Sequence, residues 1–216
     1  ILPSDDLMSS LLELKNKQIL TSKGKVIAIN PLPLNSKNIE EELAEYKVVE
    51  TKADFLQLEN VWDLFKLNDS AIRADTELLK STKTFVAPSE TNQILGEDIF
   101  IEEGAKVECA ILNTTSGPIY IAKGAEVMEG SILRGPIAVC ENGVIKMGAK
   151  IYGATTVGPY SKVGGEVNNC MIQGYSNKGH DGFLGNAVLG EWCNLGADTN
   201  NSNLKNNYQS VDIYNY

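Results

Sequence analysis

Apolar residues in the second half of the chain recur at every sixth position, a spacing that fits neither an α-helix nor a half-exposed β-strand. The run is unbroken over eight aliphatic residues: Ile121, Val127, Leu133, Val139, Ile145, Ile151, Val157 and Val163. The third residue after each anchor is usually a turn former, and the fourth is small. One aliphatic anchor, a short extended stretch and a corner every six residues predict a parallel β-solenoid, with coils about 4.8 Å apart.

Three flat sides per coil would place Ile121, Val139 and Val157 above one another in one inward column. An antiparallel sandwich of short strands is the alternative, but its turn signals would recur at roughly 8 to 12 residues. Two breaks interrupt the hexads, at residues 109–119 and 167–183. Because the repeat itself is occupied with packing, we expect function at a break, and we expect the first break to be a polar connection.

The first 90 residues follow a different pattern, with Gly24 as their only glycine. Ser4 is placed to cap a helix that runs to about residue 14, with acidic residues in its first turn. Further elements are predicted in this order: a hairpin at 19–27, an acidic helix at 39–46, a strand at 48–49, and helices at 57–65 and 70–79. The aromatic stripe of the helix at 57–65 is expected to lie in the core.

Two domains are therefore expected. Residues 1–90 form a small α+β segment that caps the solenoid, and residues 91–216 form the β-helix. The fold class is mainly β.

Composition and charge narrow the possible partners. The chain has 216 residues, of which 43% are hydrophobic, and no apolar run approaches the roughly 18 residues of a membrane helix, so no membrane contact is expected. A net charge of -9 opposes a polyphosphate backbone, which argues against a nucleic acid partner. The four cysteines lack metal-binding spacing and predict reduced thiols in a cytoplasmic protein. The start at Ile1 without methionine suggests a longer protein, truncated at both ends.

The chain's only histidine, His180, lies in the second break, where a lone histidine is usually structural or simply exposed. Its context is more specific: His180, then Phe183-Leu184-Gly185-Asn186-Ala187, then Asn194-Leu195-Gly196-Ala197-Asp198-Thr199, and then Asn203. These motifs and the hexads resemble the hexapeptide-repeat acyltransferase family. The resemblance is to the acetyltransferase half of the bifunctional glucosamine-1-phosphate acetyltransferase/N-acetylglucosamine-1-phosphate uridyltransferase. It implies a left-handed parallel β-helix and a homotrimer.

The resemblance also implies a reaction, acyl transfer from acetyl-CoA as co-substrate to a sugar amine. His180 would be the general base, since a neutral imidazole can take the amine proton as the nitrogen attacks the thioester. Backbone N–H groups at Gly196 and Ala197 would lie at the cofactor and stabilise the oxyanion of the tetrahedral intermediate. Asn194 and Asn203 fall where the family places amide side chains near acceptor and donor.

Four positions depart from the family pattern, and one of them is Tyr152, where the family has an arginine in the preceding coil. Asn168 and Phe183, at the implied substrate site, replace a lysine and a tyrosine, and Asp198 replaces a glycine. Losing a cation and a hydroxyl while gaining a carboxylate weakens the grip on a phosphate. The expected acceptor is therefore an unusual amino sugar, sugar phosphate or sugar nucleotide, or there is no turnover. Lys178 and Lys205 are the nearest remaining cations, and solvated surface lysines are the commoner case.

Two other functions remain open from the sequence. Residues 1–90 resemble the tail of a nucleotidyltransferase domain, so the complete protein can be a sugar-1-phosphate nucleotidyltransferase whose β-helix only trimerises. In that case Mg²⁺ would be needed by residues outside this chain. A non-catalytic scaffold is the third reading and predicts no saturable binding of acetyl-CoA. A β-helix zinc enzyme is disfavoured, because such a site needs three histidines, so no metal is expected.

Overall fold

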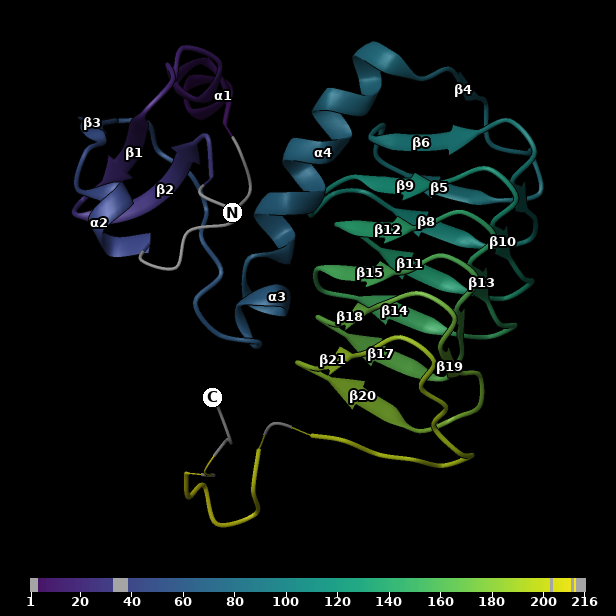
Figure 1. The fold of residues 1–216 in the computed structure, drawn as a ribbon. Coiled ribbons are helices and arrows are strands. Elements are labelled where there is room, and N and C mark those ends of the chain that lie inside the picture. Colours follow the sequence, from purple (N-terminus) through teal and green to yellow (C-terminus); the bar gives the residue numbers. More distant parts are fainter. Residues whose placement is uncertain (1–3, 33–38, 203, 211, 213–216) are drawn as a thin grey trace. The chain divides into compact units, whose positions relative to one another are not determined.

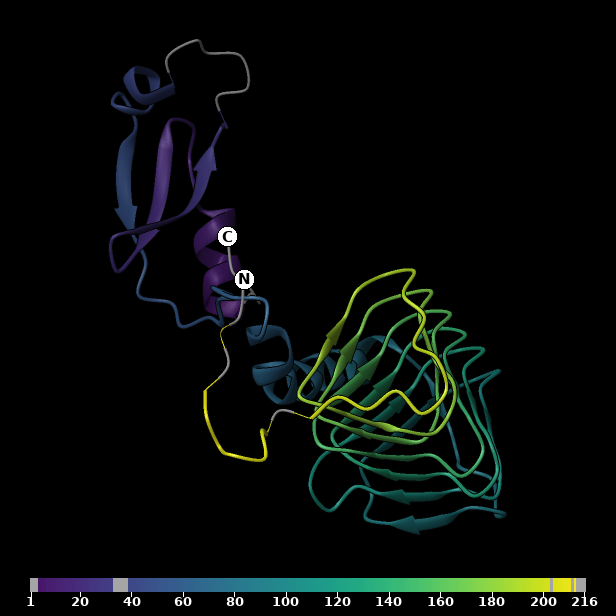
Figure 2. The same ribbon diagram turned by 90° about the horizontal axis from the view of Figure 1, so that it is seen from below.

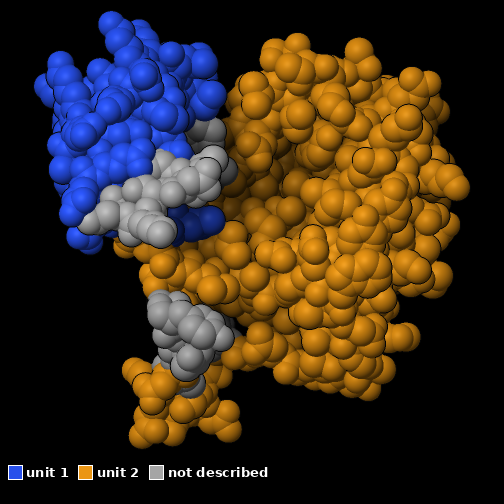
Figure 3. Space-filling model, in the orientation of Figure 1, with its two compact units in different colours: residues 1–58 blue, residues 59–216 orange. Residues whose placement is uncertain are grey.

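The computed structural model describes residues 4–32, 39–202, 204–210 and 212. These residues form two compact units, Ile1–Leu58 and Glu59–Tyr216 (Figure 3). The boundary that the sequence predicted at residue 90 lies inside the second unit, because the helix and strand that precede it pack on the solenoid.

The first unit is built around a three-stranded sheet in the order β2-β1-β3. Its elements are α1 (Asp5–Leu12), β1 (Gln18–Ser22), β2 (Lys25–Asn30), α2 (Ile39–Leu43) and β3 (Lys47–Glu50). The Ser4 side chain caps α1 as expected, accepting a hydrogen bond from the backbone N–H of Leu7 at 3.2 Å. The hairpin of β1 and β2 is confirmed, and β3 pairs parallel with β1.

The second unit is a parallel β-solenoid with three sheets, seen from the side in Figure 1 and from below in Figure 2. The five-stranded sheet contains β7 (Lys106–Val107), β10 (Glu126–Val127), β13 (Val144–Ile145), β16 (Lys162–Val163) and β19 (Asn177–Lys178). The six-stranded sheet contains β5 (Gln93–Leu95), β8 (Ile111–Asn113), β11 (Ile132–Arg134), β14 (Lys150–Tyr152), β17 (Glu166–Asn168) and β20 (Phe183–Gly185). The seven-stranded sheet contains β4 (Phe85–Val86), β6 (Ile99–Glu102), β9 (Ile119–Ile121), β12 (Ile137–Val139), β15 (Thr155–Val157), β18 (Met171–Ile172) and β21 (Val188–Leu189).

The hexad anchors form the core of the solenoid, as predicted. All eight are at most 1% exposed. Val139 pairs in parallel register with Ile121 on one side and with Val157 on the other, which confirms the predicted column. The fold class is thereby confirmed: the chain is mainly β, and the solenoid fits the left-handed parallel β-helix that the resemblance implied, preceded by a small α+β segment.

The coils differ in length at the second break. Val163 pairs with Ile145, 18 residues earlier, but with Lys178 only 15 residues later. Beyond the shortened coil, Ile172, Lys178 and Leu184 again follow one another at six-residue spacing, and all three are buried. Lys178 therefore occupies the anchor position of its hexad and points into the solenoid.

Helix α4 (Asn68–Thr82) packs along the seven-stranded sheet (Figure 1). Asn68, Ile72 and Thr76 are buried and lie four residues apart, so they form one face of the helix. Asn68, only 2% exposed, donates from Nδ2 to the carbonyl of Ala154 at 2.8 Å and accepts from the hydroxyl of Thr156 at 2.9 Å. This buried amide joins the helix to the solenoid.

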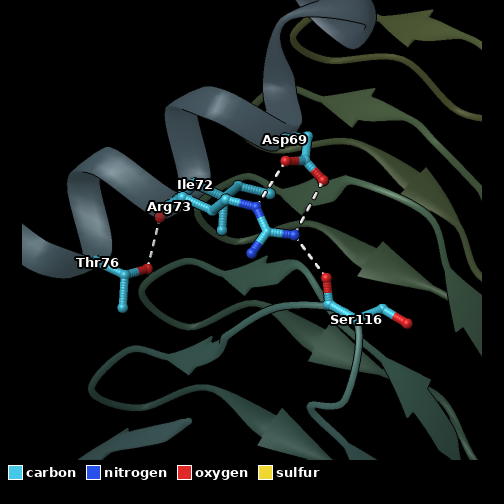
Figure 4. A network of polar contacts seen from close by, with 5 residues as sticks. All are labelled: Asp69, Ile72, Arg73, Thr76 and Ser116. Atoms are coloured by element: carbon cyan, nitrogen blue, oxygen red, sulfur yellow. Dashed lines mark hydrogen bonds and ion pairs between the residues drawn. The ribbon is translucent and has the colours of Figure 1, made fainter.

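A second polar contact holds the next turn of α4 (Figure 4). The Arg73 guanidinium forms an ion pair with Asp69 at 2.7 Å and also donates to the carbonyl of Ser116. That carbonyl belongs to the first break in the hexads. In the described structure, the polar loop at 113–118 therefore meets α4, in keeping with a connection.

The prediction of a helix at residues 57–65 is wrong. The structure has only the short α3 (Asp63–Lys66) there, and Val61, within the range of the predicted helix, is 62% exposed. The Asp63 carboxylate accepts hydrogen bonds from the backbone N–H groups of residues 59 and 60, at 2.9 and 2.8 Å. These bonds form a turn that competes with an earlier helix start. The helix predicted at 70–79 is confirmed as α4.

One corner of the solenoid carries three stacked aromatic rings. Tyr160, Tyr175 and Trp192 come from successive coils, with ring centroids 5.2 and 4.8 Å apart and planes within 5° of parallel. All three have positive φ angles of 56–58°. That left-handed backbone costs a bulky residue about 1–2 kcal/mol, and stacking returns about 0.5–1.5 kcal/mol for each ring pair.

Within the part of the chain that the structure describes, no helix has both the length and the apolar character needed to span a membrane.

Candidate functional site

The chain's only histidine lies on a solvent-exposed corner between β19 and β20, at residues 179–182. Two glycines allow this corner to pack against its neighbours. At Gly165, in the coil before, a Cβ atom would lie 3.0 Å from the carbonyl oxygen of His180. Gly182 has a φ of +117°, and a Cβ there would overlap the carbonyl of Thr199 in the following coil. Residues with side chains would force the corner outward at either position.

The last described coil lies directly against the histidine corner. The backbone N–H of Asp198 donates to the carbonyl of Asp181 at 3.0 Å, and that of Leu195 donates to Asn177 at 2.8 Å. These two bonds lie on either side of Gly196 and Ala197 in the sequence, so the structure brings the predicted cofactor turn beside the corner of His180. Gly196 and Ala197 are both exposed.

The same turn has a defined internal geometry. The carbonyl of Gly196 accepts hydrogen bonds from the hydroxyl of Thr199 at 2.9 Å and from its backbone N–H at 3.4 Å. This carbonyl is therefore directed into the turn. Such a turn can present backbone N–H groups outward, which is the property that stabilisation of an oxyanion requires.

The predicted substrate residues divide into two groups. Phe183 follows the histidine corner directly, and its backbone N–H donates to the side chain of Asn200 in the next coil at 2.8 Å. Asn168 is on the paired strand β17 but opposite the far end of β20, at Gly185. Asn194 is exposed and pairs with β19 through a single bridge to Asn177. Asn203 lies outside the described residues.

The corner combines two exposed carboxylates with one buried amine. Asp181 and Asp198 are exposed, whereas Lys178 is 1% exposed. Burial lowers the pKa of the Lys178 amine, and the two carboxylates act in the opposite direction with a smaller effect. Because the exposed groups are acidic, the surface favours the amine end of a ligand over a phosphate. Across residues 4–32, 39–202, 204–210 and 212, no cluster of three His, Cys, Asp or Glu side chains could hold a metal ion.

Lys178 is the residue that reasoning from the sequence missed. A solvated surface lysine was the expectation, and the structure shows the opposite. The signal was present in the spacing: Lys178 lies six residues after Ile172 and six before Leu184, both of which are anchors. Counting hexads across the break would have placed this side chain inside the solenoid.

Fold and corner together define a β-helix protein of hexapeptide repeats with an exposed histidine on one late corner. Comparison with known proteins adds two similarities. Residues 1–84 match the family described as sugar nucleotidyl transferase. The chain is also similar to the bifunctional protein GlmU of Alkaliphilus metalliredigens (strain QYMF), with 26% identity over 180 residues, covering 68% of this chain. The chain spans 37% of the length of that relative.

These matches confirm the resemblance inferred from the sequence: with its solenoid, the chain fits a GlmU-like hexapeptide-repeat protein.

Proposed function

We propose that this chain carries the acyl-transfer site of a coenzyme-A-dependent N-acyltransferase that acts on an amino sugar, a sugar phosphate or a sugar nucleotide. The observation that supports the proposal best is the placement of His180 on an exposed corner beside the turn of Gly196 and Ala197. A proton acceptor and a source of backbone N–H groups thus lie in adjacent coils, as amide formation from a thioester requires.

The proposed reaction assigns one role to each part of the corner. The amine nitrogen of the sugar attacks the thioester carbonyl carbon of acetyl-CoA while His180 takes a proton from that nitrogen. The carbonyl oxygen becomes an oxyanion, which the N–H groups of the turn stabilise. The C–S bond then breaks, and the departing thiolate receives a proton from the imidazolium. The products are an N-acetyl sugar and coenzyme A.

The charge of the corner supports an acceptor that presents its amine. Asp181 and Asp198 attract the protonated form of an amine, which releases one proton to solvent before its nitrogen attacks, and they repel a phosphate placed at the same point. A phosphate or nucleotide on the acceptor would therefore point away from these carboxylates. The Phe183 ring lies over Gly185 on the same strand, so an apolar side chain stands where the family has a hydroxyl.

The test combines binding with turnover. Calorimetric titration of acetyl-CoA into the wild type and a His180→Ala variant should give dissociation constants within about threefold of one another, while acyl transfer to the accepted amino sugar falls at least about 10²-fold in the variant. Met147→Ala, on an exposed corner of an earlier coil, is the control and should retain transfer. Full acyl transfer by a folded His180→Ala variant would refute the assignment.

Three further points belong to this proposal. A homotrimer is expected from the resemblance and can be checked by sedimentation equilibrium. The cytoplasmic location stays a prediction. Acetyl as the acyl group is tested by comparing acetyl-CoA with longer acyl-CoA thioesters in the same assay.

A second function is favoured by the match of residues 1–84 to the sugar nucleotidyl transferase family. In this reading the complete protein transfers a nucleotidyl group to a sugar 1-phosphate. The first unit contains a hollow of about 480 Å³ lined in part by Lys15, Lys47 and Lys52, but its sequence has no glycine-rich loop, since Gly24 stands alone. Turnover of UTP or dTTP with Mg²⁺ by the full-length protein supports this reading, and its absence there excludes it.

A further inference from the structure

The side chain of Lys178 lies inside the solenoid, at a position that an aliphatic residue occupies in the other described coils. The side chain of Lys178 is 1% exposed, and strand β19 pairs it with Val163 in the coil before. The residues that precede it in the same inward column are aliphatic: Val107, Val127, Ile145 and Val163. Leu195 follows it in the next coil, where its backbone N–H donates a hydrogen bond to the carbonyl of Asn177.

Stability of the core does not call for an amine at this position. Moving an ammonium group out of water costs free energy, and hydrogen bonds to carbonyl groups return only part of it. The burial that lowers the pKa of Lys178 is the sign of this cost. An aliphatic side chain would continue the column without it, as Val163 does one coil earlier. The contacts of the amine must therefore explain why a lysine stands at this position.

Its contacts are two backbone carbonyls from two different coils. The Nζ atom donates to the carbonyl of His180 at 2.7 Å and to the carbonyl of Gly164 at 3.0 Å. The strand pairing adds a bond between the same coils, from the backbone N–H of Gly164 to the carbonyl of Lys178 at 2.7 Å. The amine thus joins the peptide group that follows His180 to the corner beneath it.

This connection determines the direction in which the side chain of His180 extends from the backbone. The carbonyl of a residue and its Cα–Cβ bond are fixed relative to one another once ψ is fixed, so a carbonyl held from inside the solenoid holds the side-chain direction outside it. On the other side, the following coil limits the corner, because the carbonyl of Asp181 accepts a hydrogen bond from the N–H of Asp198 and Gly182 lies against Thr199. The corner is constrained from within and from above.

We propose that Lys178 is a positioning residue for His180, acting from inside the solenoid by holding the carbonyl of His180 through its ammonium group. The inference rests on the proposed function only in giving His180 a role in acyl transfer. The placement of the imidazole itself can be tested without any substrate.

Two carboxylates also act on the charge of the Lys178 amine. Asp181, on the same corner, and Asp198, on the coil above, both favour the ammonium form. They do so from the exposed side, while the two carbonyl contacts lie on the buried side. The ammonium therefore has two carbonyl acceptors and two carboxylates that favour its charged form, and an uncharged side chain of equal length would make neither hydrogen bond.

The test uses Lys178→Met, which keeps the length and removes the ammonium. The control is Val127→Ala, which weakens the same column three coils away and leaves the carbonyl contacts intact. Because the chain has one histidine, its ring gives one set of proton NMR signals. The wild type and the control should show a single narrow set. Lys178→Met should broaden or split it, because the freed peptide group samples more than one orientation.

Turnover gives the second readout. In Lys178→Met, kcat should fall about tenfold or more while KM for acetyl-CoA stays within about twofold, because a displaced base affects the chemical step more than binding. The control should keep kcat within about twofold of the wild type, as expected of a residue that contributes only stability. An unchanged ring signal together with unchanged kcat in Lys178→Met would overturn the proposal.

A measurement on the wild type covers the case in which Lys178→Met does not fold. With ¹⁵N- and ¹³C-labelled protein, the Lys178 ammonium protons should exchange slowly with water, and the Lys178 nitrogen should show a scalar coupling across the hydrogen bond to the carbonyl carbon of His180. Fast exchange of every lysine ammonium group would refute the contact. If instead His180→Ala retains full acyl transfer, the proposed function fails, and these NMR results still decide the role of Lys178.

Discussion

Replacing Asn68 by alanine should loosen α4 from the solenoid. The buried amide makes two hydrogen bonds to the solenoid, from Nδ2 to the carbonyl of Ala154 and from the Thr156 hydroxyl to Oδ1. Their loss costs about 1 kcal/mol each, and a buried partner left unsatisfied costs about 1–3 kcal/mol more. The better helix propensity of alanine returns about 0.5 kcal/mol. We expect a net loss of about 2.5–4.5 kcal/mol in the free energy of unfolding.

Urea unfolding followed by circular dichroism measures this loss. At a slope of about 2–3 kcal/mol/M, the midpoint should fall by about 1–2 M. Ser70→Ala, at an exposed position of the same helix, should stay within about 0.5 kcal/mol of the wild type. A loss below about 0.5 kcal/mol for Asn68→Ala would refute the reasoning, because it would mean that water replaces both bonds at no cost.

A double-mutant cycle separates the two bonds. Thr156→Val removes one donor and leaves the Asn68 bond to the Ala154 carbonyl in place. The coupling energy between Asn68→Ala and Thr156→Val should be about 0.5–1.5 kcal/mol, since the side chains are in direct contact. Additive effects would show that the hydroxyl contact does not contribute.

Three other outcomes follow from single features of the solenoid. Gly182→Ala should cost at least about 2 kcal/mol in urea unfolding, because of its φ of +117° and the carbonyl in its way, whereas Gly179→Ala faces open space and should cost no more than about 1 kcal/mol; equal losses would contradict this account. Burial lowers the pKa of Lys178 below 10.5, so the folded state releases its proton before the unfolded state does. The stability of the wild type relative to Lys178→Met should therefore increase as pH rises toward 10.5, and a constant or falling difference between the two unfolding curves would argue against it. Burial raises the pKa of Cys170 to about 11, so mass spectrometry should show alkylation of exposed Cys109 well before Cys170 at pH 8, and the reverse order would contradict the burial.

The solenoid could be predicted from the sequence because its information is local and repeated. Each anchor such as Ile145 or Val157 is set by the same demand, an aliphatic side chain every six residues, and many copies of a weak signal make a strong one. The short α3 shows the opposite case. Its start depends on one side chain, Asp63, which binds two backbone N–H groups, and a hydrophobic stripe carries no trace of that competition.

The positions of the candidate residues were partly predictable from the sequence, and their roles stay predictions. His180 stands in a break of the repeat, and the structure brings it beside the turn at Gly196, as the motifs indicated. The inward direction of Lys178 was obscured because a coil of 15 residues interrupts the count that had held at 18. A lysine is rarely a core residue, so the residue type of Lys178 was given more weight than its place in the hexad repeat.

The aromatic column of Tyr160, Tyr175 and Trp192 gives the molecule an optical signal of its own. Parallel rings at 5.2 and 4.8 Å couple their electronic transitions, and the coupling exists only while three successive coils stay in register. Trp62, the other tryptophan, lies outside this column. Near-ultraviolet circular dichroism should therefore report fraying of the last coil, which carries Trp192, before the far-ultraviolet spectrum of the remaining strands changes.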